Sequence, residues 1–168
     1  TGGNDSSPPT PGDSPKDENF AWDSMLGAKL ISSSDITYSI PRRNWANNTV
    51  YDMYRHDYSP TNTSTSGSSN LYDSTFYFVT SAFRVYKVLD NNGGTAYSGA
   101  EPTSESTSPF ALGGYILKFM FTISQSDISK FVTTDFIPVA TDSTVSAAAT
   151  DGKIEALKLT AGSGYTNG

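Results

Sequence analysis

The residues best suited to chemistry lie together between residues 40 and 55, where Arg42 and Arg43 stand side by side and Trp45 follows. A guanidinium group pairs with both oxygens of a carboxylate or phosphate, and Arg and Trp are enriched where protein contacts carry most energy. Three interpretations remain open: an anion site, a clamp within the protein, or a contact with another subunit. The candidate contact or clamp residues are Arg42, Arg43, Trp45, Tyr54 and Arg55.

Catalytic patterns are absent from the sequence. His56, the only histidine, precedes Asp57, but neighbouring residues of a strand point to opposite faces, so we expect a surface histidine rather than a dyad. There is no cysteine, and the glycines of residues 161–168 match neither a nucleophile elbow nor a dinucleotide-binding loop. Residues 12–19 are acidic but lack the alternating oxygens of a calcium loop. We therefore predict no catalytic residue, no cofactor, no metal site and no enzyme activity.

Charge and composition exclude further classes of protein. The net charge of −6, without a basic cluster beyond the arginine pair, argues against nucleic-acid binding. The longest apolar run, residues 115–121, contains a lysine and is too short to cross a membrane. Apolar residues make up 36% of the chain, below the usual ~45–50%. With aromatic residues at 12%, this profile favours a β-rich protein with long polar loops that gains stability from neighbouring subunits.

Alternation of apolar and polar residues predicts most of the elements. It indicates strands near residues 36–40, 74–80, 83–90, 113–123 and 152–160. In the clearest of them one face should point into the core, with Tyr115, Leu117, Phe119, Phe121 and Ile123. Ser124, with Asp127 three residues later, predicts the start of one short helix. The predicted fold class is all-β: an antiparallel β-sandwich with long polar loops and one short helix.

The predicted domain organisation has three parts. Residues 1–22, rich in proline, should form an extended arm or loop, and residues 23–143 a β-rich domain. Residues 144–168 should be a linker followed by the start of a second β domain.

Four motifs in this order resemble a known family. They are "IPRRNW" at 40–45, "FYFVTSAFRVYKVLDN" at 76–91, "EPTSESTSPFALGGYILKFMFTIS" at 101–124 and "FIPV" at 136–139. The family is that of the baseplate wedge subunits of large contractile-tailed bacteriophages (myoviruses), and the variants in phages of cyanobacteria look most similar. The opening "GGNDSSPPTP" and the closing "GKIEALKLTAGSGYTNG" also resemble segments that flank this region in the family.

The resemblance implies a structural virion protein without enzymatic activity. It implies a location in the tail baseplate after assembly in the host cytoplasm, contacts with other wedge subunits, and a homodimer within each wedge. Family members have one domain inserted in another, so this chain would be the inserted domain with the edges of the outer one, incomplete at both ends. The arginine pair would then fix the domain entry or a neighbouring subunit.

A second function from a different class also fits the composition. Loops rich in tyrosine, serine, threonine and asparagine could stack on sugars and hydrogen-bond to them, as in a tail-associated carbohydrate-binding adhesin. A glycan-degrading enzyme is the third alternative, for which no pair of acid and base carboxylates is recognisable.

Overall fold

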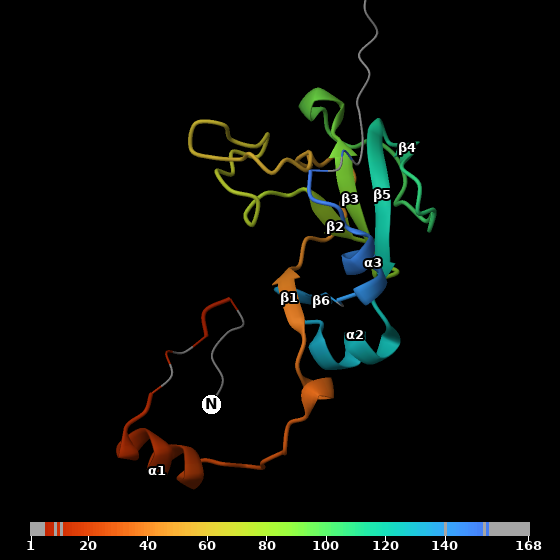
Figure 1. Cartoon of the computed structure of the whole chain (residues 1–168). Coiled ribbons are helices and arrows are strands. Elements are labelled where there is room, and N and C mark those ends of the chain that lie inside the picture. Colours follow the sequence, from red (N-terminus) through yellow and green to blue (C-terminus); the bar gives the residue numbers. More distant parts are fainter. Residues whose placement is uncertain (1–5, 9, 11, 140, 153, 155–168) are drawn as a thin grey trace, which may run out of the picture. The chain divides into compact units, whose positions relative to one another are not determined.

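The computed structural model describes residues 6–8, 10, 12–139, 141–152 and 154. Its helices are α1 (Pro15–Asp23), α2 (Gln125–Phe131) and α3 (Ser143–Ala148), with short 3-10 helices η1 (Ser33–Asp35) and η2 (Asn92–Gly94). Its strands are β1 (Tyr38–Pro41), β2 (Tyr77–Val79), β3 (Arg84–Asp90), β4 (Phe110–Leu112), β5 (Tyr115–Thr122) and β6 (Phe136–Val139) (Figure 1). Most of the strand predicted at 152–160 lies outside the described residues.

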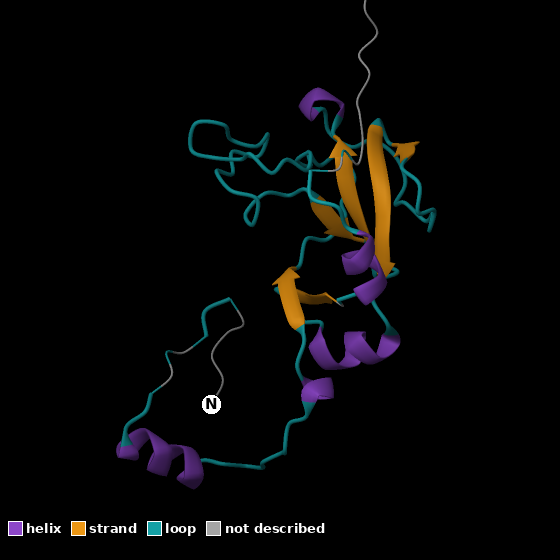
Figure 2. Ribbon diagram, in the orientation of Figure 1, coloured by secondary structure: helices purple, strands orange, loops and turns teal. Residues whose placement is uncertain are grey.

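The strands form two antiparallel sheets, and the helices are few and short (Figure 2). One sheet pairs β1 with β6, and the other has the order β2-β3-β5-β4. The prediction of a mainly β protein with antiparallel strands is confirmed at this level, while the sandwich stays a prediction. The chain divides into two compact units, the first made of residues 1–42 and 123–140 and the second of residues 43–122 and 141–168. The boundaries predicted at residues 22 and 143 remain predictions.

Helix formation is where the structure differs from the sequence prediction. α2 begins as predicted, because the Ser124 side chain accepts a hydrogen bond from the Asp127 N–H. α1, however, lies in the stretch predicted to be extended and passes its end by one residue. Its N-cap Ser14 accepts from the Asp17 N–H, and Pro15 occupies the first turn, where proline is favourable because no intrahelical N–H is needed there. α3 starts at Ser143, the last residue of the predicted β-rich domain, and continues into the predicted linker, with the Asp142 side chain as its cap.

The alternation predicted for β5 is confirmed for Tyr115, Leu117 and Phe119, whereas Phe121 is half-buried outside this core cluster and Ile123 belongs to the first unit. Tyr115 and Leu117 are fully buried, and Phe119 is half-buried against the core, whereas Ile116 and Met120 on the opposite face are exposed. β3 pairs with both β2 and β5, which makes it a central strand of the sheet. A buried strand face therefore sets the position of the core of the second unit.

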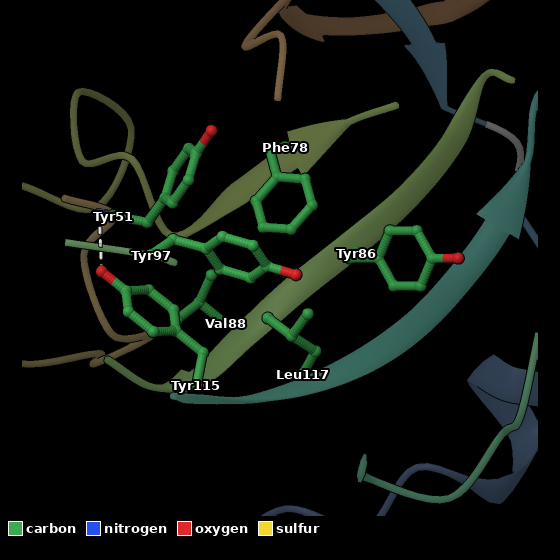
Figure 3. Packing of buried hydrophobic residues seen from close by; sticks show 7 residues of the cluster. All are labelled: Tyr51, Phe78, Tyr86, Val88, Tyr97, Tyr115 and Leu117. Atoms are coloured by element: carbon green, nitrogen blue, oxygen red, sulfur yellow. Dashed lines mark hydrogen bonds between the residues drawn. The ribbon is translucent and has the colours of Figure 1, made fainter. Parts of the chain in front are cut away.

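The core of the second unit is rich in tyrosine (Figure 3). Strand residues Phe78, Tyr86, Val88, Tyr115 and Leu117 meet Tyr51 and Tyr97, which come from segments outside the strands. Buried hydroxyl groups need partners, and they find them on the backbone. The Tyr115 hydroxyl donates to the carbonyl of Thr95 at 2.7 Å, and that of Tyr97 to the carbonyl of Ala100 at 2.9 Å. Loops thus cover this face of the sheet and are held there by tyrosine hydroxyls.

A buried carboxylate holds the polar loops of the second unit. The side chain of Asp52 is fully buried and accepts hydrogen bonds from the backbone and hydroxyl groups of both Ser66 and Thr75, at 2.7 to 3.1 Å. Burial raises the pKa of Asp52, but these hydrogen bonds outweigh it and the pKa lies below its usual value. Asn91 adds bonds to the Tyr51 carbonyl and the Thr65 hydroxyl. The long polar stretch 59–70 is therefore fixed from inside.

Residues 43–122, the larger segment of the second unit, are inserted between the two segments of the first unit along the chain. β1 and β6, which pair with each other, lie on either side of it in the sequence. Asn44 bridges to Val79, Val79 pairs with Val85, and Val85 pairs with Phe121. The entry and the exit of the inserted unit therefore lie in one row, at the same end of its sheet.

Candidate interface at the arginine pair

Arg42 fixes the end of β1 within the first unit. Its backbone N–H donates to the carbonyl of Asp135 at 2.7 Å, and its guanidinium Nη1 donates to the carbonyl of Thr133 at 2.9 Å. Both acceptors belong to the turn between α2 and β6. Arg42, the last residue of segment 1–42, is thus hydrogen-bonded to segment 123–140 of the same unit.

Arg43 makes the corresponding contacts within the second unit. Its Nη2 donates to the carbonyls of Tyr72 and Asp73, both at 3.0 Å. Its guanidinium also lies 5.7 Å from the ring centre of Tyr77. Burial raises the pKa of the Tyr77 hydroxyl, and the neighbouring positive charge of Arg43 opposes that shift. The boundary between the units thus falls between two arginines, each attached to its own unit.

Trp45 continues the edge of the four-stranded sheet. Its N–H donates to the carbonyl of Val79, and the Val79 N–H donates to the carbonyl of Arg43, both at 2.8 Å. The half-buried indole packs edge-on against Tyr97, with ring centres 6.1 Å apart. Its Nε1 is buried without a hydrogen-bond partner among the described residues. Trp45 is therefore partly buried against its own unit, and part of its ring stays exposed.

Tyr54 and Arg55 lie in the loop that follows. The Tyr54 ring packs against Phe76 with ring centres 5.3 Å apart, and the Lys87 ammonium lies 3.7 Å from the Tyr54 ring centre. Arg55 forms a two-point ion pair with Asp57 at 3.0 and 2.7 Å. The hydrogen bond from Arg55 lowers the pKa of Asp57.

The structure connects two of the five predicted residues through aromatic rings. Arg43 lies over Tyr77, Tyr77 contacts Phe76 at 5.0 Å between ring centres, and Phe76 contacts Tyr54 with Lys87 above it. We call these five side chains the cation–aromatic row. Each cation–ring contact contributes about 0.5–1 kcal/mol at an exposed site. Of the other predicted residues, Trp45 is attached to the row through the backbone beside Arg43, Arg55 pairs within its own loop, and Arg42 belongs to the first unit.

Sequence reasoning missed Phe76, Tyr77 and Lys87. The alternation of residues 74–90 predicted strands there. It could not show which side chains meet, because that depends on the pairing of β2 with β3. It also missed Asp52, whose partners lie in loops without a periodic pattern.

The described residues hold no group of three or more histidine, cysteine, aspartate or glutamate side chains that could bind a metal ion. In the same part of the chain, no helix has the length and apolar character needed to cross a membrane. His56 is exposed, and the carboxylate beside it is engaged by Arg55.

Comparison with known families decides which class of protein this is. Residues 4–100 match the family model described as bacteriophage T4, Gp8. The matched residues include the arginine pair and the whole cation–aromatic row. The chain belongs to the T4 Gp8 family of baseplate wedge proteins. The resemblance to baseplate wedge subunits is thereby confirmed. Comparisons with curated proteins and with solved structures gave no match.

Membership in the Gp8 family has consequences for the alternatives. The protein is a structural component of a phage baseplate, located in the virion tail, and it interacts with other baseplate proteins. The adhesin alternative gains no support from the family.

Proposed function

We propose that this protein builds the baseplate wedge through protein–protein contacts, without catalysis, and that residues 42–55 are part of the contact surface or of the clamp that orients it. The observation that carries the proposal is the family match over residues 4–100, which contains this stretch. It is also supported by the types of residue in the row, because arginine and tyrosine are enriched at the centres of protein interfaces.

The two arginines have different roles in this proposal. Arg42 holds the first unit's turn at Thr133, so it acts as a clamp within the protein. Arg43 holds one end of the cation–aromatic row, and Tyr54, next to Lys87 at the other end, is exposed. The row therefore offers a partly exposed surface whose rings are already held in position, which reduces the entropy lost on binding. Both arginines donate to backbone carbonyl oxygens, and we expect one of them to pair with a carboxylate in the assembled wedge.

We further propose that the protein is a homodimer within each wedge and assembles in the host cytoplasm, as in the phages of contractile-tailed type that the motifs resemble. The dimer is tested by analytical ultracentrifugation of the full-length protein across a range of concentrations. A single species of monomer mass at micromolar concentration would contradict it.

The wedge proposal is tested by reconstitution. The full-length protein is mixed with the other wedge subunits of the same phage, and incorporation is followed by sedimentation and electron microscopy. We expect Tyr54→Ala and Arg43→Ala to reduce incorporation about tenfold, because the row loses a ring or its terminal charge. Tyr72→Ala, which removes an exposed ring but keeps the carbonyl that Arg43 uses, is the matched control. Unchanged incorporation of both row variants, with normal circular dichroism, would remove this surface from the interface.

A further inference from the structure

The chain around α1 carries large apolar side chains that the described residues leave uncovered. Leu26 and Leu30 are essentially fully exposed, and Trp22 is 66% exposed. The full set is Phe20, Trp22, Met25, Leu26, Leu30 and Ile31. Isolated exposed apolar residues are ordinary, but six large ones within residues 20–31 indicate an interaction site. We call residues 13–31 the apolar arm.

The apolar arm is anchored at its C-terminal end. Asp35 accepts hydrogen bonds from the Ser32 N–H at 3.0 Å and from the Lys29 ammonium at 2.5 Å. The Lys29 hydrogen bond is the main cause that lowers the pKa of Asp35 to about 2. Lys130 of α2 donates to the carbonyl of Ser34 at 3.2 Å. The arm therefore starts from a fixed point of the first unit.

The exposed area of the arm is large enough for a specific interface. A large free side chain has about 150–250 Å² of surface. With the exposed fractions of the six residues, the arm presents roughly 900 Å², while a stable interface buries about 800 Å² on each partner.

The charge of the arm indicates what kind of surface covers it. Asp13, Asp17, Glu18 and Asp23 accompany a single cation, Lys16, in the N-terminal half. Two arms that met each other would bring these like charges together. Complementary charges favour association and like charges oppose it. A partner with lysine and arginine around an apolar groove fits the arm better than a second copy does.

We propose that the apolar arm docks into an apolar groove, rimmed by lysine and arginine, on a different subunit of the baseplate. This inference rests on the proposed role in wedge assembly and names a second contact surface, separate from the cation–aromatic row. The indole of Trp22 and the leucines at 26 and 30 are the anchors, and the acidic residues of α1 face the basic rim.

The test is site-specific photo-cross-linking in the full-length protein. p-Benzoylphenylalanine replaces Leu26 or Leu30, the protein is mixed with the purified wedge subunits of the same phage, and cross-linked peptides are identified by mass spectrometry. We expect a cross-link to a different subunit, in a segment where apolar residues alternate with lysine or arginine. The same probe at exposed Ser106 is the control. Cross-links only within the chain, only to a second copy, or none above the control overturn the proposal.

Variants give a second, quantitative test against the subunit that is cross-linked. The double variant Leu26→Ser/Leu30→Ser should weaken binding at least tenfold. Asp13→Lys/Asp23→Lys should also weaken it and reduce its dependence on salt. Val145→Ser, which removes an exposed apolar side chain elsewhere, should leave the Kd unchanged. Wedges that incorporate the double leucine variant normally would refute the arm contact and leave the wedge role intact, whereas exclusion of the unmodified protein from wedges would refute the wedge role itself.

Discussion

Replacing Asp52 by asparagine isolates the contribution of one buried charge to the second unit. The substitution keeps the shape of the side chain but removes its charge and one of its two acceptor oxygens. In the native protein one oxygen accepts from the Ser66 N–H at 2.8 Å, and the other accepts from the Ser66 hydroxyl and from both donors of Thr75. If the asparagine oxygen keeps the bonds from the Ser66 hydroxyl and from Thr75, the NH₂ group must point at the Ser66 N–H. Two donors then face each other without an acceptor.

The expected cost follows from these contacts. Hydrogen bonds to a charged group contribute about 1.5–3 kcal/mol each, and a buried donor left without a partner costs about 1–3 kcal/mol. Some of the bonds survive in weaker, neutral form, so we expect Asp52→Asn to lower the free energy of unfolding by about 3–5 kcal/mol. The free energy of unfolding of a small domain is only about 5–15 kcal/mol, so this loss is a large part of the total.

The assay is urea unfolding at pH 7, monitored by tryptophan fluorescence in a Trp22→Phe background. Trp45, packed against Tyr97 in the second unit, is then the only indole. Asp151→Asn, at an exposed position, is the control and should change the free energy by less than about 0.5 kcal/mol. An Asp52→Asn protein as stable as this control would refute the view that the carboxylate holds the loops.

The lowered pKa of Asp52 predicts part of the loss of stability in acid. The pKa of Asp52 is lower in the folded protein than its ordinary value of 3.8, so its contribution is present above that value and is lost as pH falls toward the folded pKa. Unfolding free energies measured between pH 6 and pH 2 should therefore fall less steeply in Asp52→Asn than in the unmodified protein.

Three further predictions concern packing and tyrosine ionisation in the second unit. Leu117→Ala should lower the free energy of unfolding in urea by about 2–5 kcal/mol, because the residue is fully buried. Ile116→Ala, on the exposed face, should lower it by well under half of that amount. Equal losses would contradict the assignment of faces. Gly113→Ala would place a Cβ 2.6 Å from a ring atom of Tyr97, so it should lower the melting temperature more than Gly67→Ala, where φ is also positive but the space is open. Burial raises the pKa of Tyr97 to about 12, so its contribution to stability is complete below pH 10 and is lost as pH rises from there toward 12; Tyr97→Phe should reduce that alkaline loss in pH-dependent melting curves.

The sequence predicted best those features that depend on local periodicity. The alternation of residues 115–123 identified the buried face of β5, and a serine followed three residues later by an aspartate identified the start of α2. Both signals arise from contacts within one element. They therefore do not depend on knowing the partner strands.

Long-range contacts could not be predicted in this way. Tyr51 and Tyr97 complete the core from loops, and the bonds of Asp52 reach residues 66 and 75. No repeating pattern marks such positions. α1 was missed for a different reason: several prolines favoured an extended arm, but one of them occupies the first helical turn, where proline is tolerated.

For the candidate site, residue type was a better guide than spacing. Arginine beside an aromatic residue drew attention to Arg43 and Tyr54, which the structure links through Phe76 and Tyr77. The division of the arginine pair between two units was not foreseeable, because it depends on where the chain leaves β1. Whether these residues contact a neighbour stays a prediction until assembled wedges are tested.

The insertion of residues 43–122 between β1 and β6 also constrains the order in which the protein folds. Pro41 and Phe136 must find each other across a loop of roughly 90 residues, which costs about 4 kcal/mol of chain entropy if the loop is unstructured. In the folded insert, residues 44 and 121 lie on a line across the sheet, three strand spacings or roughly 15 Å apart. If the insert folds first, this short span therefore replaces the long unstructured loop. We therefore expect β1, although it leaves the ribosome first, to wait unpaired until the insert and β6 have been synthesised. Its exposed edge makes the nascent chain vulnerable to aggregation during that interval, so the yield of soluble protein should depend on how fast the insert folds.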